Sequence, residues 1–403
     1  MRIIHKNIIR MASFLFLLGF FLEAFSANQT SATKPYYVNE GVSFACDAAS
    51  LSQIKFDMNA YLVSLGIAAK LVVTNVDIAN SRLTFTLNTP THDADTLQLK
   101  SKSEYAIRHG IVRIPDEHGK LQRIITVSKK EILLALLQHG RLTEFSGSNC
   151  NVNALKEQVN LRQNIVAWAE RLNWIWPDGE AAEWNAKYWH KGTPHAKVAL
   201  HIAFGDAFKH QRKYAIGCYT AAKLVMVQGV LDYYRRIKQN KYQQNLVEAQ
   251  LLLDNEPLVN IEPGEMWSFE SDFDPQKRMQ RGKILTIQYK VAPLNFVPGD
   301  WAYVLNTDPV SAQKTGYEGS NAIYLGRNKF VDFYNDNHHA YSYKQKLDEV
   351  YQWRNGVFSR RRDAAKIKPL SSEDYQRLGQ SPAKNGLVQS FRVFPKNFEN
   401  FVY

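Results

Sequence analysis

The chain has 403 residues, of which 45% are hydrophobic and 22% are charged, a composition that indicates a globular protein rather than a disordered or fibrous one. The sequence contains no internal repeat or low-complexity tract, which excludes a solenoid. Lysine and arginine outnumber aspartate and glutamate by 50 to 38, so the chain carries a formal net charge of +12 and attracts polyanions.

The first 26 residues are predicted to be a signal peptide. A basic region at 2–10, an apolar run at 12–22 and a small-x-small cleavage site at 24–26 follow one another in the order typical of export signals. The apolar run is too short to span a bilayer, although a membrane anchor is the alternative interpretation. We therefore expect a periplasmic or secreted mature chain that begins near Ala27 and has no stable membrane insertion after signal removal.

The predicted leader accounts for two of the positive charges, which leaves +10 on the mature chain. Outside the cytoplasm the matching polyanions are anionic cell-envelope polymers and acidic proteins, and nucleic acid is not an expected partner. The densest basic run is Arg360–Arg362, which we interpret as a solvated charge cluster.

Residues 27–150 are predicted to form an N-terminal α+β domain of unknown role. Alternating apolar stretches indicate strands around one helix at 51–69. The next helix begins with a predicted capping box made by Ser128 and Glu131. A stretch rich in serine and glycine then indicates a linker near 141–150.

Residues 151–360 are predicted to form a second domain, followed by a C-terminal extension at 361–403. The domain opens with an amphipathic helix at about 153–173. Five of the eight tryptophans lie between Trp168 and Trp189. Such a cluster either lines a groove for an extended substrate or packs in the core, and core packing is the commoner role.

The remainder of this domain is predicted to be rich in strands. Strands are expected at 282–291 and 296–306, and a hairpin at 316–334 that turns at its Gly-Arg-Asn sequence. Ser342 and Gln345 form a capping box at the start of the last helix of the domain.

Three cysteines are present: Cys46, Cys150 and Cys218. In an oxidising compartment an odd count leaves one thiol over, and three pairings are open. Cys46 and Cys150 both lie in polar, loop-like surroundings that favour a structural disulfide. We therefore favour their pairing, which leaves Cys218 as the thiol.

Cys218 opens a predicted helix at 218–234. Leu224, Val227 and Leu231 recur at spacings of three and four, which is typical of an amphipathic helix. The amides at a helix start stabilise a thiolate and hold a developing oxyanion, while the alternative is a buried cysteine that acts as a small hydrophobe. Because strands follow this helix, the order of elements matches papain-like thiol enzymes, in which strands supply the general base.

A thiol nucleophile needs a proton acceptor within hydrogen-bond reach. The candidates after the helix are Glu318, Asp332, His338 and His339. Imidazole titrates near neutral pH, which favours a histidine, whereas apolar neighbours on the predicted strand would raise the pKa of Glu318 toward a useful range. A solvated histidine pair and a surface glutamate are the alternatives. No metal-binding pattern or phosphate-binding loop is recognisable, so neither a metal nor a cofactor is expected.

Three motifs resemble, in the same order, those of the small bacterial spore-type transglutaminases, the protein-glutamine gamma-glutamyltransferases. They are LRQNIVAWAERL at 161–172, GCYTAAKLVMVQGVLDYY at 217–234, and PGDWAYVLNTDP followed by YEGSNAIYLGRNKF at 317–330. The resemblance covers roughly half of the chain and aligns Cys218 with the family's nucleophile. The chain departs from the family at Gly217, where the family has an acidic residue, and at Ser320, where the family has its catalytic glutamate.

The resemblance implies an α+β fold with a papain-like core, in which the nucleophile helix packs on an antiparallel sheet. It implies an exported thiol acyltransferase that forms a Cys218 thioester with a protein glutamine and transfers the acyl group to a lysine, giving a cross-link, or to water, giving deamidation. Because Ser320 lacks a carboxylate, Glu318 or His339 is the expected proton carrier. The expected partners are protein substrates that bear glutamine and lysine. A papain-like cell-wall amidase or peptidase, and a non-catalytic secreted binding protein on the same fold, are the alternatives.

Overall fold

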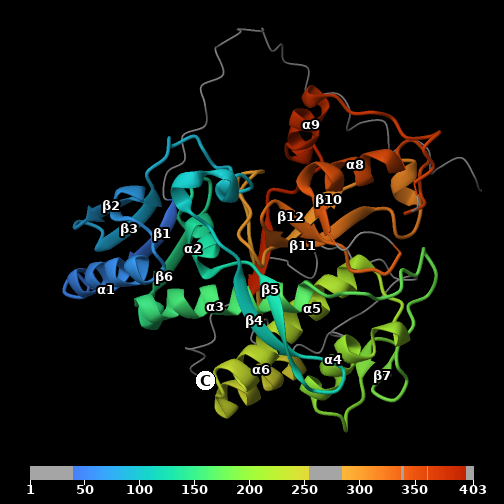
Figure 1. Ribbon diagram of the computed structural model, residues 1–403, viewed down its shortest axis with the longest axis horizontal. Helices are drawn as coiled ribbons and strands as arrows, with labels where there is room; N and C mark the ends of the chain where they lie inside the picture. Colours follow the sequence, from blue (N-terminus) through green and yellow to red (C-terminus); the bar gives the residue numbers. More distant parts are fainter. Residues whose placement is uncertain (1–39, 254–283, 337–339, 361, 396–403) are drawn as a thin grey trace, which may run out of the picture. The chain divides into compact units, whose positions relative to one another are not determined.

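The computed structural model describes residues 40–253, 284–336, 340–360 and 362–395. These residues all belong to one compact unit (Figure 1). The predicted signal peptide lies outside the described residues, and the predicted division into domains near residue 150 stays a prediction.

The helices and strands of the described residues have the following bounds. The helices are α1 Leu51–Ser64, α2 Lys129–Leu137, α3 Val152–Ala169, α4 Leu200–Lys209, α5 Cys218–Asp232, which continues as a π-helical turn at Tyr233–Ile237, α6 Lys241–Leu253, α8 Tyr343–Trp353 and α9 Ser372–Leu378. The strands are β1 Gly41–Ala45, β2 Val72–Asp77, β3 Arg82–Leu87, β4 Gly110–Pro115, β5 Leu121–Thr126, β6 Leu142–Ser146, β7 Trp189–His190, β8 Thr193–Pro194, β9 Leu285–Gln288, β10 Trp301–Leu305, β11 Gly319–Gly326, β12 Lys329–Val331, β13 Ala340–Ser342 and β14 Arg392–Pro395.

A four-stranded sheet with the order β2-β3-β1-β6 contains the first strands of the described chain. The central strand β1 pairs antiparallel with β3 and parallel with β6. Side chains alternate between the two faces of a strand, and the buried face of this sheet carries a ring cluster in which Phe44 lies 6.2 Å from Phe85 and 5.3 Å from Phe145. Helices α1 and α2 pack against this sheet (Figure 1).

A six-stranded sheet with the order β13-β12-β11-β10-β14-β9 forms the second layer system, and its neighbouring strands are antiparallel. All eight residues of β11 are buried, as expected for a central strand that is covered on both faces. The side chain of Asn321 reaches Cys218 at the start of α5, whereas the preceding residue, Ser320, reaches Lys346 of α8. Since successive side chains point to opposite faces, α5 and α8 cover opposite faces of this sheet (Figure 1).

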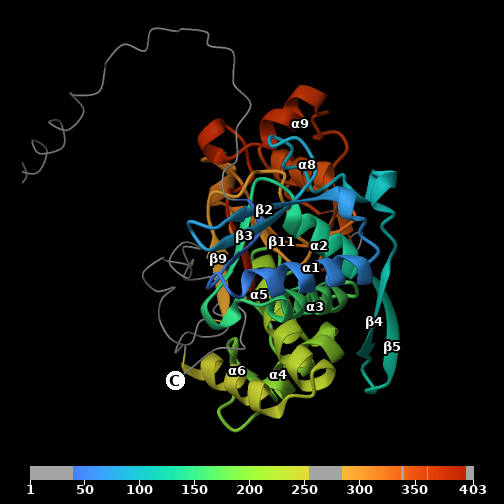
Figure 2. The same ribbon diagram turned by 90° about the vertical axis from the view of Figure 1, so that its left-hand side faces the viewer.

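Helices α3 and α5 approach each other closely at Gly229. A Cβ atom at this position would lie 2.4 Å from a side-chain carbon of Ile165, so only glycine fits there. On its other side α3 contacts the two-stranded ribbon β4–β5, which runs along one side of the unit (Figure 2). Gln163 of α3 donates from Nε2 to the carbonyl of Val127 at 2.8 Å, which anchors the end of the ribbon.

The local predictions at the helix starts are confirmed in part. The predicted capping box at Ser342 and Gln345 is confirmed, with both hydrogen bonds formed. Ser128 accepts from the amide of Glu131 at 3.2 Å, but the other half of this predicted box is wrong. The Glu131 carboxylate instead accepts from the amide of Arg327 at 2.5 Å, because the β11–β12 turn lies against this helix end.

Within the described residues, the predicted strands, hairpin and helices are present, mostly with shorter bounds. The hairpin turns at Gly326, Arg327 and Asn328, all with positive φ, as the Gly-Arg-Asn sequence predicts. The helix predicted at 51–69 ends at Ser64, and the helix predicted at 153–173 spans Val152–Ala169. The α+β class is therefore confirmed, and so is the packing of the Cys218 helix on an antiparallel sheet.

The predicted disulfide between Cys46 and Cys150 is confirmed, with a Cα–Cα distance of 5.8 Å. The bond joins the end of β1 to the loop that precedes α3, across 104 residues of chain. Cys218 is left as a thiol.

Candidate active site

Cys218 is the first residue of α5, as predicted. Gly217 precedes it with an extended backbone and serves as the N-cap. The N–H groups of the first helical turn have no intrahelical acceptor and carry a partial positive charge. Cys218 is half-buried, so its sulfur lies at the positive end of the helix with some access from outside.

Asn321 provides two hydrogen-bond donors to the Cys218 sulfur. Its backbone N–H lies 3.4 Å from Sγ and its side-chain Nδ2 lies 3.5 Å from Sγ. The amide is held in this orientation because its Oδ1 accepts from the Trp301 indole at 2.8 Å. Amide donors directed at sulfur favour the thiolate, which is the nucleophilic form of cysteine.

The register of the sheet positions these groups. Strand β10 pairs with β11 so that Tyr303 lies opposite Asn321 and Trp301 lies opposite Ile323. The Tyr303 ring packs directly on Gly319, where an added Cβ would lie 2.4 Å from the hydroxyl oxygen. The Gly319 carbonyl is 3.9 Å from the Cys218 sulfur. Glycine at position 319 is thus required for the close approach of the Tyr303 ring.

A small cavity of about 20 Å³ adjoins the Cys218 sulfur, with room for about one water molecule. Its lining combines aromatic rings, charged groups and the backbone of β11. The lining residues are Trp176, Cys218, Gly316, Gly319, Ser320, Asn321, Val331, Asp332, Phe333, Tyr334, Lys346, Trp353 and Arg360.

The charged wall of this cavity is a buried ion-pair network. Arg360 donates from Nη2 to both oxygens of Asp332 at 2.5 Å, and from Nε to Asp336 at 2.7 Å. Lys346 donates to Glu349 at 2.8 Å and to the Ser320 hydroxyl at 3.2 Å. Two cations and three carboxylates therefore lie within a few ångströms of one another.

The interpretation of Arg360–Arg362 as a solvated charge cluster is wrong for Arg360. Its side chain is only 12% exposed because it enters this network. Arg362 pairs with Asp348, and residue 361 lies outside the described residues. A run of basic residues does not by itself predict which of its side chains form ion pairs with carboxylates that are distant in the sequence.

Two of the four candidate proton carriers, Asp332 and Glu318, lie within the described residues and occupy different places. Asp332 lines the cavity beside Cys218, and burial raises its pKa although Arg360 and Lys346 oppose the effect. Glu318 lies one residue before Gly319 and accepts from the Gly316 amide at 3.1 Å, and burial raises its pKa above the ordinary value. His338 and His339 lie outside the described residues.

Glu318 and Cys218 share a neighbour in Tyr303. Burial raises the pKa of Tyr303, and the charges of Cys218 and Glu318 raise it further. Both ionisable groups therefore lie near the same phenol, although no hydrogen bond joins Glu318 to the sulfur among the described contacts.

Three residues of the site were not recognised as functional from the sequence: Asn321, Tyr303 and Lys346. Asn321 and Tyr303 stand in the motifs that were identified, but the donors to sulfur depend on the β10–β11 register. Lys346 carried no sequence signal beyond its place in an amphipathic helix. The tryptophan cluster packs mainly in the core, since Trp168, Trp174 and Trp189 are at most 6% exposed, while Trp176 contributes a wall of the cavity.

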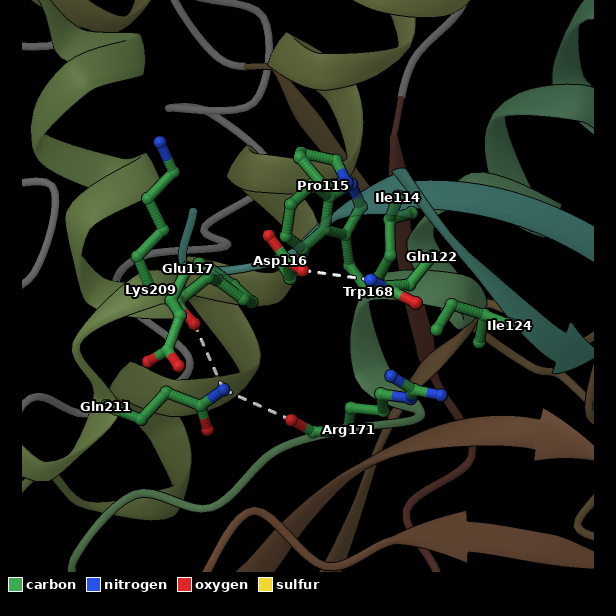
Figure 3. Close-up of a pocket in the computed structure, with 11 residues that line it drawn as sticks. Ile114, Pro115, Asp116, Glu117, Gln122, Ile124, Trp168, Arg171, Lys209 and Gln211 are labelled. Atoms are coloured by element: carbon green, nitrogen blue, oxygen red, sulfur yellow. Dashed lines mark hydrogen bonds between the residues drawn. The ribbon is translucent and has the colours of Figure 1, made fainter. Parts of the chain in front are cut away.

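A second cavity of about 230 Å³ lies between the tip of the β4–β5 ribbon and the ends of α3 and α4 (Figure 3). Trp168 and Phe208 contribute apolar walls. Asp116 accepts hydrogen bonds from the side chain of Gln122 at 2.9 Å and from the amides of His118 and Lys120 in its own turn. This cavity holds no cysteine and is separate from the nucleophile.

Among the described residues, no three histidine, cysteine or carboxylate side chains are grouped so as to hold a metal ion. Within the described ranges, none of the helices has both the length and the apolar character that crossing a bilayer requires.

Comparison with known proteins gives the family. The chain matches the family model described as protein-glutamine gamma-glutamyltransferase over residues 111–337, more than half of its length. No curated protein matches its sequence. Among solved structures, the chain is similar to "Transglutaminase from Geobacillus stearothermophilus (without C-terminal extension)", with 16% identity, 61% of this chain and 94% of that chain covered, and a TM-score of 0.36. The chain belongs to the protein-glutamine gamma-glutamyltransferase family and is a cysteine-dependent enzyme of the transglutaminase type.

Proposed function

We propose that the chain transfers the γ-glutamyl group of protein glutamines through a Cys218 thioester. The observation that carries the proposal is the placement of an unoxidised Cys218 sulfur at the start of α5 with two Asn321 donors on it. The positive end of the helix and the two amide donors both favour the thiolate form of this sulfur.

In the first half-reaction the thiolate attacks the carboxamide carbon of the glutamine side chain. The carbonyl oxygen becomes an oxyanion, which the N–H groups at the start of α5 are placed to stabilise. The C–N bond then breaks, the amide nitrogen takes up a proton and leaves as ammonia, and the acyl group remains on sulfur as a thioester.

In the second half-reaction a lysine amine attacks the thioester carbonyl, loses a proton and releases the thiolate, which yields an isopeptide cross-link. Water in place of the amine yields deamidation. The amine prevails where water is excluded from the thioester. The rings of Trp176, Tyr334 and Trp353 around the cavity support such exclusion.

We assign the proton transfers to Glu318. Its raised pKa keeps the carboxyl protonated to a higher pH, so that it is able to protonate the departing ammonia and then accept the proton of the incoming amine. Asp332 is the competing carboxyl because it lines the cavity, but its two oxygens are engaged by Arg360. His339 stays the other predicted carrier.

The export of the chain is also part of the proposal. The Cys46–Cys150 disulfide supports it, because disulfides persist mainly in oxidising compartments. Cleavage near Ala27 would release the mature protein to the periplasm or the exterior, where anionic envelope polymers are available partners of its basic surface. Mass spectrometry of the N-terminus of protein purified from cells tests this part, and a retained leader on disulfide-bonded protein would overturn the cleavage site.

The reaction is tested by incubating the protein with a glutamine-bearing protein and a labelled primary amine. We expect amine incorporation together with one ammonia released per acyl transfer. A matched incubation with purified peptidoglycan tests the alternative hydrolytic function. Cleavage of peptidoglycan without amine incorporation would overturn the proposal. It would show that water is the acyl acceptor and that cell-wall peptide is the substrate.

A further inference from the structure

The outward face of the β4–β5 ribbon is an amphipathic surface. The register pairs three couples of residues on this face, namely Ile111 with Ile125, Arg113 with Arg123 and Pro115 with Leu121. Pro115 also lines the cavity beneath the tip of the ribbon, so we call the other five residues the ribbon face. The side chains of Ile111, Ile125 and Leu121 are 52%, 63% and 51% exposed.

The inner face of the ribbon already supplies its contacts with the core. Ile114 and Ile124 point inward and are 6% and 2% exposed. They contribute to the cavity walls next to Trp168 (Figure 3). A ribbon that needed only one buried face would carry polar residues on the other, so the exposed aliphatic side chains indicate an external partner.

Arg113 and Arg123 lie directly opposite each other across the two strands, and both are exposed. Cβ atoms of such a pair are about 5 Å apart, and like charges at this spacing repel. Within the described part of the chain neither guanidinium has an ion pair or a hydrogen bond. The charge of this pair is therefore left for an external anion, and two adjacent guanidinium groups match the oxygens of one phosphate.

We propose that the ribbon face docks on an anionic phospholipid surface. Arg113 and Arg123 bind headgroup phosphate, and the aliphatic side chains enter the boundary between headgroups and acyl chains. Aliphatic residues flank the arginine pair at both ends of one face, and this arrangement lets cations stay at headgroup level while apolar side chains insert. Figure 2 shows the ribbon at one edge of the unit. An acidic protein would have to match the same face by shape, which a lipid surface need not do.

Cosedimentation with vesicles tests the proposal. The full chain is mixed at fixed ionic strength with vesicles of phosphatidylcholine alone, or of phosphatidylcholine with phosphatidylglycerol. We expect binding to the anionic vesicles that weakens as salt rises. The double variant R113Q/R123Q should bind them about thirtyfold less tightly, the factor that two cations contribute at an anionic lipid surface. The double variant I111S/I125S should bind about tenfold less tightly because it removes the inserted apolar surface.

The matched control is K55Q/K70Q, which removes the same charge from two exposed lysines elsewhere on the chain. All variants carry the same N-terminal segment, so its contribution to vesicle binding cancels in the comparison. Thermal melting checks that each variant is folded. Equal binding by R113Q/R123Q and K55Q/K70Q would overturn the proposal, because charge alone would then explain it. Retention on immobilised polyglutamate without binding to either vesicle would also overturn it, in favour of an acidic protein partner.

Discussion

The side-chain amide of Asn321 lies 3.5 Å from the Cys218 sulfur, and the backbone amide of the same residue lies 3.4 Å from it. One residue of β11 thus provides two hydrogen-bond donors to the Cys218 sulfur. The position of the sulfur depends on α5 and the position of its donors depends on β11, so the activity depends on how these two elements pack.

Replacement of Asn321 by alanine tests the role of the donors. We expect kcat/KM for amine incorporation to fall about ten- to hundredfold, because a hydrogen bond to a charged group contributes about 1.5–3 kcal/mol. Alkylation of Cys218 by iodoacetamide near pH 6 should slow in parallel, since less of the sulfur is thiolate. The matched control is N295A, which removes another buried asparagine whose Nδ2 donates to the His139 carbonyl. Slower alkylation in both variants would indicate a general loss of structure.

Replacement of Cys218 by alanine should abolish amine incorporation and thioester formation. The side chain is half-buried and small, so we expect the free energy of unfolding to change by no more than about 1 kcal/mol. Activity is measured by ammonia release and stability by thermal melting. Amine incorporation at the wild-type rate by folded C218A protein would show that another group is the nucleophile.

The variants E318Q and D332N distinguish the two carboxyls near the site. Burial raises the pKa of Glu318, so its proton-donating form persists to higher pH, and activity that depends on this form is present below the raised pKa and is lost as pH rises through it. E318Q should abolish this loss of activity at high pH, which is the alkaline limb of the pH profile. It should also lower kcat about hundredfold.

D332N should retain that limb of the pH profile. It removes the partner of Arg360 and should therefore destabilise the fold by about 3–5 kcal/mol, so rates are compared well below its melting temperature. If the alkaline limb of the pH profile disappears in D332N and persists in E318Q, Asp332 and not Glu318 is the proton carrier.

The disulfide should stabilise the fold by restricting the unfolded chain. For a bond that closes 104 residues, we expect the variant C46S/C150S to lose about 3–5 kcal/mol of unfolding free energy. Denatured wild-type protein should expose one thiol to Ellman's reagent without reductant and three after reduction. Three thiols without reductant would contradict the pairing.

Asp300 is predicted to make stability depend on acid pH. It is fully buried and accepts from Arg141 at 2.7 Å and Arg162 at 2.8 Å. Burial alone would raise the pKa of Asp300, but the two guanidinium groups together hold it below the ordinary value. The stabilisation is therefore fully present above the unfolded pKa of about 3.9 and is lost as pH falls through the lower folded value.

D300N should remove this pH dependence and cost about 3–5 kcal/mol near neutral pH, because it leaves two buried cations without their carboxylate. Urea unfolding at several pH values measures both effects. The control is D363N, whose exposed pair with Lys366 should change the free energy of unfolding by less than about 1 kcal/mol. Similar effects of both variants would contradict the importance of the buried pairs.

Local signals in the sequence predicted the elements that carry the site. Gly217 and the apolar spacing after it predicted a helix that begins at Cys218, and the Gly-Arg-Asn sequence predicted the hairpin turn that follows β11. These predictions succeeded because caps, turns and periodicity depend on neighbours within a few residues. Only half of the capping box predicted at Ser128 is formed. The Glu131 carboxylate instead accepts a hydrogen bond from the amide of Arg327, almost two hundred residues away in the sequence.

The sequence by itself predicted the α+β class of fold, favoured the Cys46–Cys150 disulfide and marked Cys218 as the candidate nucleophile, because each of these rests on residue type and local surroundings. Only the tertiary structure decided that Asn321 faces the sulfur, that Arg360 is buried against Asp332, and that Lys346 donates to the Ser320 hydroxyl. Those contacts depend on strand register and on which helices cover the two faces of one sheet. Such choices are made by the packing of the whole chain, and no stretch of a few residues contains them.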